Sequence, residues 1–311
     1  MKRPHLLLVN ELIKPINNTK KIISEIKSTI DISSPKIVLY GIFSYTVSIF
    51  EIMQNEILFY YLDKYPEKIH SEKTQINKEY IGSSSFFIRK NLIQDYVISL
   101  NYNSIKIFMK QFFNILSIDN EDENTIDQII EIKETRNLLL HNNLKVNDVY
   151  IKKSGKMCRA TQDDVITEKK LLLDYNYTIN TVNIIENILL SIENKLIIKY
   201  KKFTRHYVFK QIWDYLFKSP VLNFDDYFYS SGEIINLKPN KVSYIKRMVK
   251  NGFSSTEVKF LFLIFSHLFP SLSDKIFKPR FLNCYSLDHY SKEKYNYLNS
   301  ILANYIEIFQ N

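Results

Sequence analysis

A run of apolar residues over positions 37–65 most constrains how this chain can fold. Within it, bulky apolar side chains recur at intervals of three, four and seven residues, at Leu39, Phe43, Phe50, Met53, Ile57 and Tyr61. This spacing places them on one face of an α-helix, and Pro66 marks its end. Because so long an apolar face must be covered by other elements, the pattern predicts a core built from packed helices.

Other ranges repeat the helical spacing. Further helices are predicted for residues 20–30, 90–116 (broken near 101–103), about 125–140 and 168–200. Residues 149–152 and 156–159 flank Ser154-Gly155, which predicts a small β-hairpin, since Ser-Gly can supply its turn. We therefore expect an all-α fold, a four-helix bundle with a small β-hairpin insertion, followed by a second helical domain.

The predicted helices divide the chain into three parts. Residues 1–35 are interpreted as an N-terminal helical extension, 36–200 as the four-helix bundle and 201–311 as a basic helical C-terminal domain, in which 230–240 is expected to be a loop. The last part holds 16 Lys and Arg against nine Asp and Glu, whereas residues 1–200 hold 26 against 24. A basic region attracts nucleic acids and acidic lipid surfaces. A solvated Lys-rich surface explains the same charge equally well.

Glycine and cysteine usage excludes several classes of protein. The five glycines are scattered singly, so the glycine-rich loops of P-loop NTPases and Rossmann dehydrogenases are absent. The two cysteines, Cys158 and Cys284, form neither a disulfide framework nor a zinc cluster, and we expect no metal and no cofactor. The longest uncharged stretch, residues 37–50, is shorter than the about 20 apolar residues of a membrane span. These features favour a soluble, cytoplasmic protein without a membrane segment.

The segment with the most chemical information is Glu134–Asn143, with the sequence E-T-R-N-L-L-L-H-N-N. It resembles the R-N-x-x-x-H form of the R-x(4–6)-H motif of the HEPN (higher eukaryotes and prokaryotes nucleotide-binding) superfamily. A long aromatic-rich helix with an internal acid, Glu51, the sequence V-N-D-x-Y at 146–150 and a closing helix extend the resemblance over residues 36–200. Residues 201–311 remain outside it.

The residue types of the motif suit RNA cleavage. His141 can exchange protons near neutral pH, and the guanidinium of Arg136 matches phosphate oxygens. Side chains five residues apart on a helix point about 140° away from each other. These two therefore meet in one site only if the helix ends near His141, or if two protomers share the site. Asn137 lies four residues before His141, and Lys133 four before Asn137, so all three share a face.

The family resemblance implies a metal-independent endoribonuclease that leaves 2′,3′-cyclic phosphate and 5′-hydroxyl ends. It implies a homodimer with a composite active site, and a role as a toxin or an anti-phage abortive-infection effector under an antitoxin or a phage-derived trigger. Carried onto this chain, Arg136 and His141 would be catalytic and Asn137 would support them. Lys133 and Asn142 would bind the RNA substrate, and Glu51 would brace Arg136 or His141.

Other interpretations of the same residues stay open. Arg136 could simply pair with Glu131 or Glu134, and Glu51 could be exposed on the surface. The chain could then be a non-catalytic module that binds RNA or a protein. Two positions also depart from family patterns. Asn143 replaces the tyrosine of toxins silenced by a nucleotidyltransferase antitoxin, and Leu144 replaces a glycine that many relatives carry.

Overall fold

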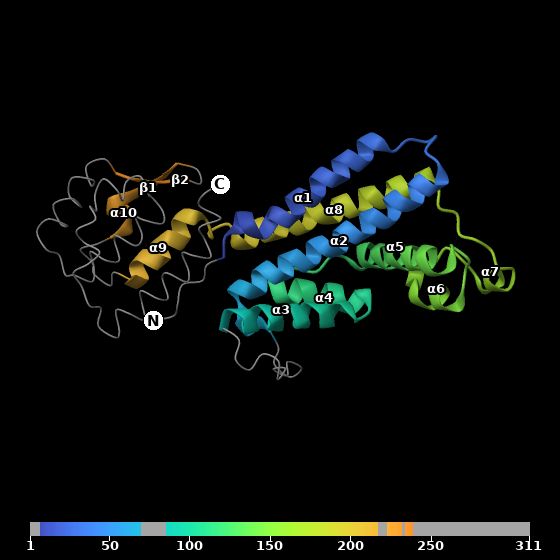
Figure 1. Ribbon diagram of the computed structural model, residues 1–311, viewed down its shortest axis with the longest axis horizontal. Coiled ribbons are helices and arrows are strands. Elements are labelled where there is room, and N and C mark those ends of the chain that lie inside the picture. The colour runs from blue at the N-terminus through green and yellow to red at the C-terminus, as the bar shows by residue number, and fades with distance from the viewer. Residues whose placement is uncertain (1–6, 70–84, 217–222, 232–233, 239–311) are drawn as a thin grey trace, which may run out of the picture. The chain divides into compact units, whose positions relative to one another are not determined.

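The computed structural model describes residues 7–69, 85–216, 223–231 and 234–238 (Figure 1). Helices account for 77% of the described residues, which confirms the all-α class at this level. The chain divides into two compact units between Phe203 and Thr204, and each unit is described by itself.

The described part of the first unit consists mainly of helices. In chain order they are α1 (Val9–Thr29), α2 (Lys36–Lys64), the 3-10 turn η1 (Pro66–Lys68), α3 (Ser85–Asn101), α4 (Ile105–Leu116), α5 (Glu123–Asn142), α6 (Asp148–Lys153), the 3-10 turn η4 (Gly155–Met157), α7 (Gln162–Ile166) and α8 (Tyr175–Tyr200). The expected break near 101–103 is confirmed, because α3 ends at Asn101 and Ser104 caps α4 by accepting a hydrogen bond from the Ile107 amide.

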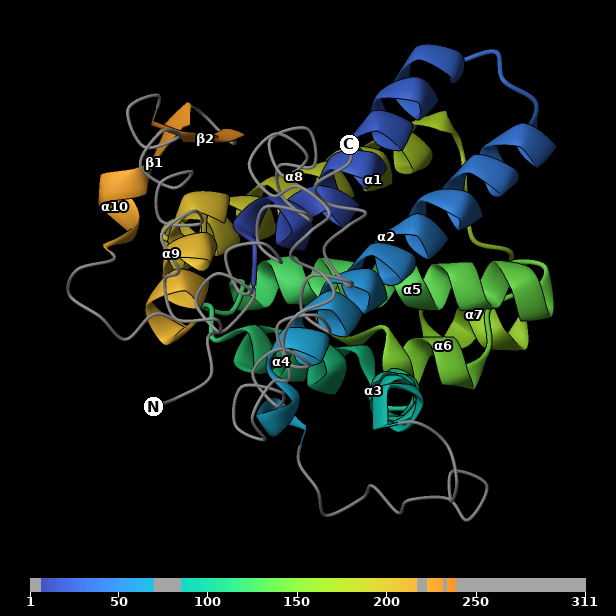
Figure 2. The ribbon, with the colours of Figure 1, turned by 60° about the vertical axis from the view of Figure 1, so that its left-hand side comes forward.

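Helix α2 is the centre of this unit. It packs along α1 and α8, and it also contacts α3, α4 and α5 (Figures 1 and 2). All six apolar residues on which its prediction rested are buried. Helix α2 is also long and apolar enough to cross a membrane by length and composition alone. In this structure its buried side chains belong to the common hydrophobic core of the unit.

Helix α1 begins at Val9, eleven residues before the expected start at Lys20. Buried side chains at Leu12, Ile16 and Ile23 continue one face across Pro15, so tertiary packing extends the helix beyond its strongest local signal. This face lies against α2 and α8, and Lys20 pairs with Glu193 of α8 at 2.7 Å. The segment assigned to an N-terminal extension is therefore part of the helical core.

The expected β-hairpin at 149–159 is wrong, because this segment forms α6 and η4 instead. Asn147 starts α6 by accepting a hydrogen bond from the Tyr150 amide at 2.9 Å. The Tyr150 side chain is buried and its hydroxyl donates to Glu131 of α5, so a contact distant in sequence holds the helical turn. Helix α8 also starts later than expected, at Tyr175, where Asp174 caps it.

The described part of the second unit contains α9 (Arg205–Leu216), α10 (Phe224–Tyr227) and the antiparallel strands β1 (Phe228–Ser231) and β2 (Ile234–Leu237). The loop expected at 230–240 is therefore wrong where β2 forms, since its residues pair with β1 in register from Phe228 opposite Leu237. Asp225 joins α10 to α9 through an ion pair with Lys210 and a hydrogen bond with the His206 ring. The rest of the predicted C-terminal domain, including residues 239–311 with Cys284, lies outside the described residues.

Candidate active site

Helix α5 carries the motif and sets the direction of each side chain. Asp122 caps its start by accepting a hydrogen bond from the Thr125 amide at 2.9 Å. The helix runs without a break past His141 to Asn142. Arg136 and His141 therefore point about 140° apart within one chain. Of the two arrangements expected to bring them into one site, a helix end near His141 is present, because α5 ends at Asn142; a site shared by two protomers stays a prediction.

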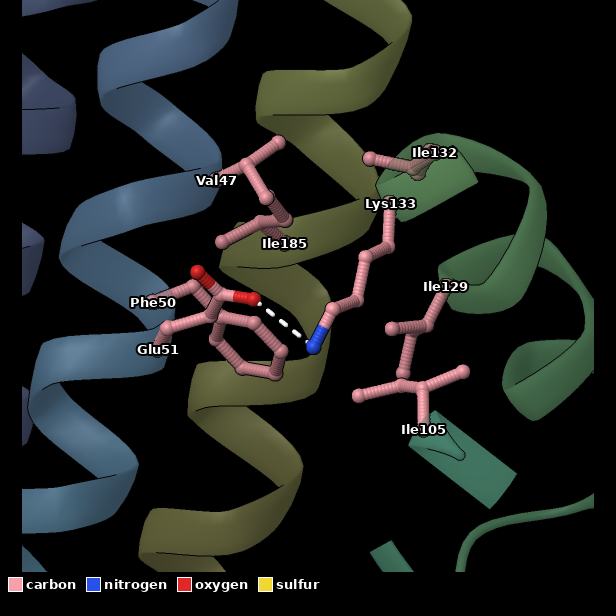
Figure 3. A pocket seen from close by; sticks show the side chains of 8 residues that line it. All are labelled: Val47, Phe50, Glu51, Ile105, Ile129, Ile132, Lys133 and Ile185. Atoms are coloured by element: carbon pink, nitrogen blue, oxygen red, sulfur yellow. Dashed lines mark ion pairs between the residues drawn. The ribbon is translucent and has the colours of Figure 1, made fainter. Parts of the chain in front are cut away.

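Glu51 of α2 is the partner of Arg136. One carboxylate oxygen pairs with Nη2 of Arg136, and the other lies 2.9 Å from Nζ of Lys133 (Figure 3). All three side chains are between 18% and 26% exposed. Glu51 thus supports Arg136, and neither Glu131 nor Glu134 forms the ion pair that the alternative interpretation required. Two cations share one carboxylate, so the cluster keeps one net positive charge.

A small pocket lies beside this cluster. Its walls are Glu51 and Lys133 together with the apolar side chains of Val47, Phe50, Ile105, Ile129, Ile132 and Ile185 (Figure 3). Its volume of about 10 Å³ is close to what one water molecule needs. The apolar walls reduce the local polarity, which strengthens the ion pair between Lys133 and Glu51 compared with one in open water.

Arg136 has further hydrogen-bonding capacity. Its Nη1 donates to Oδ1 of Asn137 at 3.2 Å, and Nδ2 of Asn137 donates weakly to Glu134 at 3.4 Å. Its Nε is buried and has no hydrogen-bond partner within the described part of the chain. A buried donor of this kind is uncommon, because most buried polar atoms in proteins are paired. The guanidinium thus has one donor that no described residue satisfies.

His141 and Asn142 lie at the end of α5, away from the carboxylate cluster. His141 is exposed, and its ring has no hydrogen bond or ion pair with any described residue. Asn142 instead donates from Nδ2 to the Lys145 carbonyl at 2.7 Å and so closes the turn after α5. The next two residues, Asn143 and Leu144, have positive φ angles of 48° and 63°. Leu144 thus adopts the left-handed conformation that glycine accepts most readily.

Sequence reasoning missed a second cluster on α5, centred on the buried Glu131. Its carboxylate accepts hydrogen bonds from Thr135 at 2.6 Å, Tyr150 at 2.7 Å, Arg159 at 2.8 Å and Tyr177 at 2.6 Å. The Arg159 guanidinium also lies 3.7 Å from the centre of the Tyr177 ring. Burial and the nearby Glu131 charge raise the pKa of Tyr150 to about 12 and also raise the pKa of Tyr177. The V-N-D-x-Y sequence at 146–150, which contains Tyr150, was the only local sequence signal of the Glu131 cluster.

The functional interpretation rests on the residues of this chain. Among the described residues, no three His, Cys, Asp or Glu side chains gather as a metal site would require. Comparisons of the chain with protein-family models, with curated proteins and with solved structures find no match. The sequence-predicted residues fall into two groups. Glu51, Lys133, Arg136 and Asn137 form one connected cluster, whereas His141 and Asn142 lie apart from it at the end of α5.

Proposed function

We propose that this protein is a metal-independent endoribonuclease of the HEPN type that works as a homodimer in the cytoplasm. The observation that carries the proposal is the anchoring of Arg136 by Glu51 across 85 residues of sequence. A partly exposed arginine held by one carboxylate is suited to bind a phosphate. The role as a toxin or abortive-infection effector, with an antitoxin or phage-derived trigger, rests on the family resemblance.

The proposed reaction needs a base, an acid and a charge that stabilises the phosphorane. The imidazole of His141 takes the proton of the 2′-hydroxyl, and the 2′-oxygen attacks the phosphorus. The bond from phosphorus to the 5′-oxygen breaks, the leaving oxygen takes a proton from a water molecule, and the resulting hydroxide takes the proton of the His141 imidazolium. Arg136 neutralises the added negative charge on the phosphate oxygens. Proton transfers of this kind contribute about 10²–10⁴-fold in rate.

A dimer would solve the geometric problem of α5, because Arg136 and His141 of one chain point to different sides. Helix α2, beside the Glu51 cluster, offers a surface for a second copy. Val38, Tyr45 and Ile52 are 40%, 50% and 54% exposed and recur every seven residues. Gly41 lies between them, and a side chain there would meet no atom within 4 Å. Because helical glycine costs about 0.5–1 kcal/mol and nothing in this chain needs the space, Gly41 favours the approach of a partner helix.

The second candidate function is a non-catalytic RNA- or protein-binding module. Two observations favour it. The Glu51 carboxylate already neutralises one of the two cations beside it, and no described residue orients the His141 ring. Under this alternative, the wild-type protein would not cut RNA, and replacing Arg136 would reduce only the binding of RNA or of a protein.

Mutation of the two motif residues tests the proposal. In an RNA cleavage assay containing EDTA, we expect the wild-type protein to cut RNA and the variants Arg136→Ala and His141→Ala not to cut it. Lys152→Ala, an exposed substitution on α6, should cut RNA at the wild-type rate. Melting temperatures identify any variant that has merely unfolded. Folded variants that still cut RNA at the wild-type rate would refute the assignment. A wild-type protein that binds RNA but never cuts it would favour the binding module.

Mixing the two inactive variants tests the shared site. If each site takes Arg136 from one protomer and His141 from the other, a mixed dimer contains one complete site. We therefore expect partial recovery of cleavage when Arg136→Ala and His141→Ala are unfolded together and refolded as a mixture. Refolding each variant alone is the control. A mixture that forms mixed dimers but stays inactive would contradict the composite site.

A further inference from the structure

The turn between α3 and α4 presents an unusually exposed aromatic side chain. Tyr102 is 86% exposed, and the nearby Ile98 and Ile107 are 42% and 49% exposed. A tyrosine ring leaves most of its apolar surface in water here, and it makes no ring contact with any other described residue. The ring is therefore available to a partner.

Hydrogen bonds fix the backbone on both sides of Tyr102. Asn101 donates to the Asn55 side chain of α2 at 3.2 Å. Asn103 donates both to the Leu100 carbonyl at 3.2 Å and to Gln111 at 3.3 Å. A turn held in this way presents the ring from a fixed position, so binding has less conformational entropy to remove.

The same turn lies next to the Arg136 cluster. Ile105, three residues after Tyr102, lines the small pocket together with Glu51 and Lys133 (Figure 3). Asn55, which contacts the turn, is one helical turn along α2 from Glu51, or about 6 Å. Tyr102 and the Glu51 carboxylate that holds Arg136 are therefore linked through the same stretch of α2.

The charge on α4 suits an anionic ligand. The helix contains Lys106 and Lys110 and no acidic residue. Both lysines are exposed, share a face because they are four residues apart, and form no ion pair with any described residue. The positive end of the helix dipole adds to their field, since Tyr102 lies just before the start of α4.

We propose that Tyr102 is a stacking platform for a base of single-stranded RNA, with Lys106 and Lys110 contacting the adjoining phosphates. Every base has a π-face, so stacking on tyrosine tolerates any sequence. Bases inside an A-form duplex are not accessible to such a ring, so the site selects unpaired RNA. This inference rests on the proposed function, because it places the ring beside the cluster that would hold the phosphate to be cleaved.

The test measures RNA affinity separately from cleavage. In a His141→Ala background, fluorescence anisotropy with a labelled single-stranded RNA should show 5- to 150-fold weaker binding for Tyr102→Ala, the range that loss of one base–aromatic stack implies. Tyr102→Trp should retain affinity. Tyr229→Ala, in the second unit and also exposed at 45%, is the matched control. Lys106→Gln and Lys110→Gln should each reduce the slope of log affinity against log salt by about 0.7.

The outcomes separate this inference from the proposed function. Equal affinity of Tyr102→Ala and the background protein would overturn the stacking site, as would the absence of RNA binding or a preference for duplex RNA. The ribonuclease proposal is decided independently by Arg136→Ala and His141→Ala in the cleavage assay. A protein that binds RNA through Tyr102 but does not cut it would retain the stacking site and refute the ribonuclease.

Discussion

Glu131 of α5 and Glu51 of α2 each form a cluster with side chains of α5, and the surroundings of the two carboxylates differ. Glu131 is 5% exposed and accepts hydrogen bonds from four side chains of α5, α6, α8 and the segment between them. Glu51 is 26% exposed and meets two cations, one of which keeps a buried nitrogen without a partner. The first cluster is buried and saturated with hydrogen bonds, whereas the second is partly exposed and has two cations for one carboxylate.

The physical reason is the cost of burying charge. A carboxylate removed from water must regain its hydrogen bonds from the protein, so a fully satisfied cluster such as that of Glu131 has no capacity left for substrate. An open cluster gives up part of that stabilisation and can accept a phosphate instead. We infer that the Glu131 cluster maintains the fold, whereas the Glu51 cluster serves the proposed chemistry.

The largest expected effect comes from Glu131→Ala. Removal of one partner from a buried ion pair leaves Arg159 uncompensated, and the free energy of unfolding should fall by about 3–5 kcal/mol. Urea denaturation followed by circular dichroism measures this loss. Glu134→Ala, a half-buried neighbour on the same helix, is the control. A loss below about 1 kcal/mol would remove the distinction between the two clusters.

High pH should weaken the Glu131 cluster. The pKa of Tyr150 is raised to about 12 in the folded protein, above its ordinary value near 10. The folded state therefore favours the neutral phenol, and this stabilisation is complete below pH 10 and is lost as the pH rises from 10 to 12. Melting temperatures across this interval should fall more steeply for the wild type than for Tyr150→Phe. Parallel curves would show that Tyr150 does not contribute.

The turn after α5 contains Leu144, and substitutions at this residue measure the backbone strain of the turn. Leu144 is buried, yet its φ is 63°. Both Leu144→Ala and Leu144→Gly lose the buried side chain, but glycine avoids the left-handed penalty of about 1–2 kcal/mol. The glycine variant should therefore be the more stable of the two by about 1 kcal/mol in urea denaturation. The opposite order would show that the backbone relaxes when the side chain is removed.

The smallest effect on stability, with a large one on activity, is expected for Glu51→Gln. A partly exposed ion pair contributes about 1 kcal/mol or less. Misplacement of Arg136 should nevertheless reduce RNA cleavage by about 10- to 100-fold. Glu56→Gln, an exposed change on the same helix, should alter neither quantity. If Glu51→Gln instead destabilised the protein as strongly as Glu131→Ala, both clusters would be structural.

Local pattern predicted much of the fold. The spacing of apolar residues identified α2 almost to the residue, and Asn101–Asn103 identified the break between α3 and α4. The expected β-hairpin was wrong because Ser-Gly is compatible with several turns, and the contact of Tyr150 with Glu131, 19 residues away, decided between them. The start of α1 was missed because its first turns are stabilised by packing against α2 and α8.

The sequence by itself determined which chemical groups are available: an arginine, an asparagine and a histidine on one helix, and an acid inside another. Only the tertiary structure decided which of them meet. Glu51 faces both Lys133 and Arg136, the His141 ring faces outward, and Asn142 closes a turn. Helical periodicity depends on neighbours three and four residues away, whereas the pairing of Glu51 with Arg136 joins residues 85 positions apart. No local pattern contains that contact, because it depends on how α5 packs on α2.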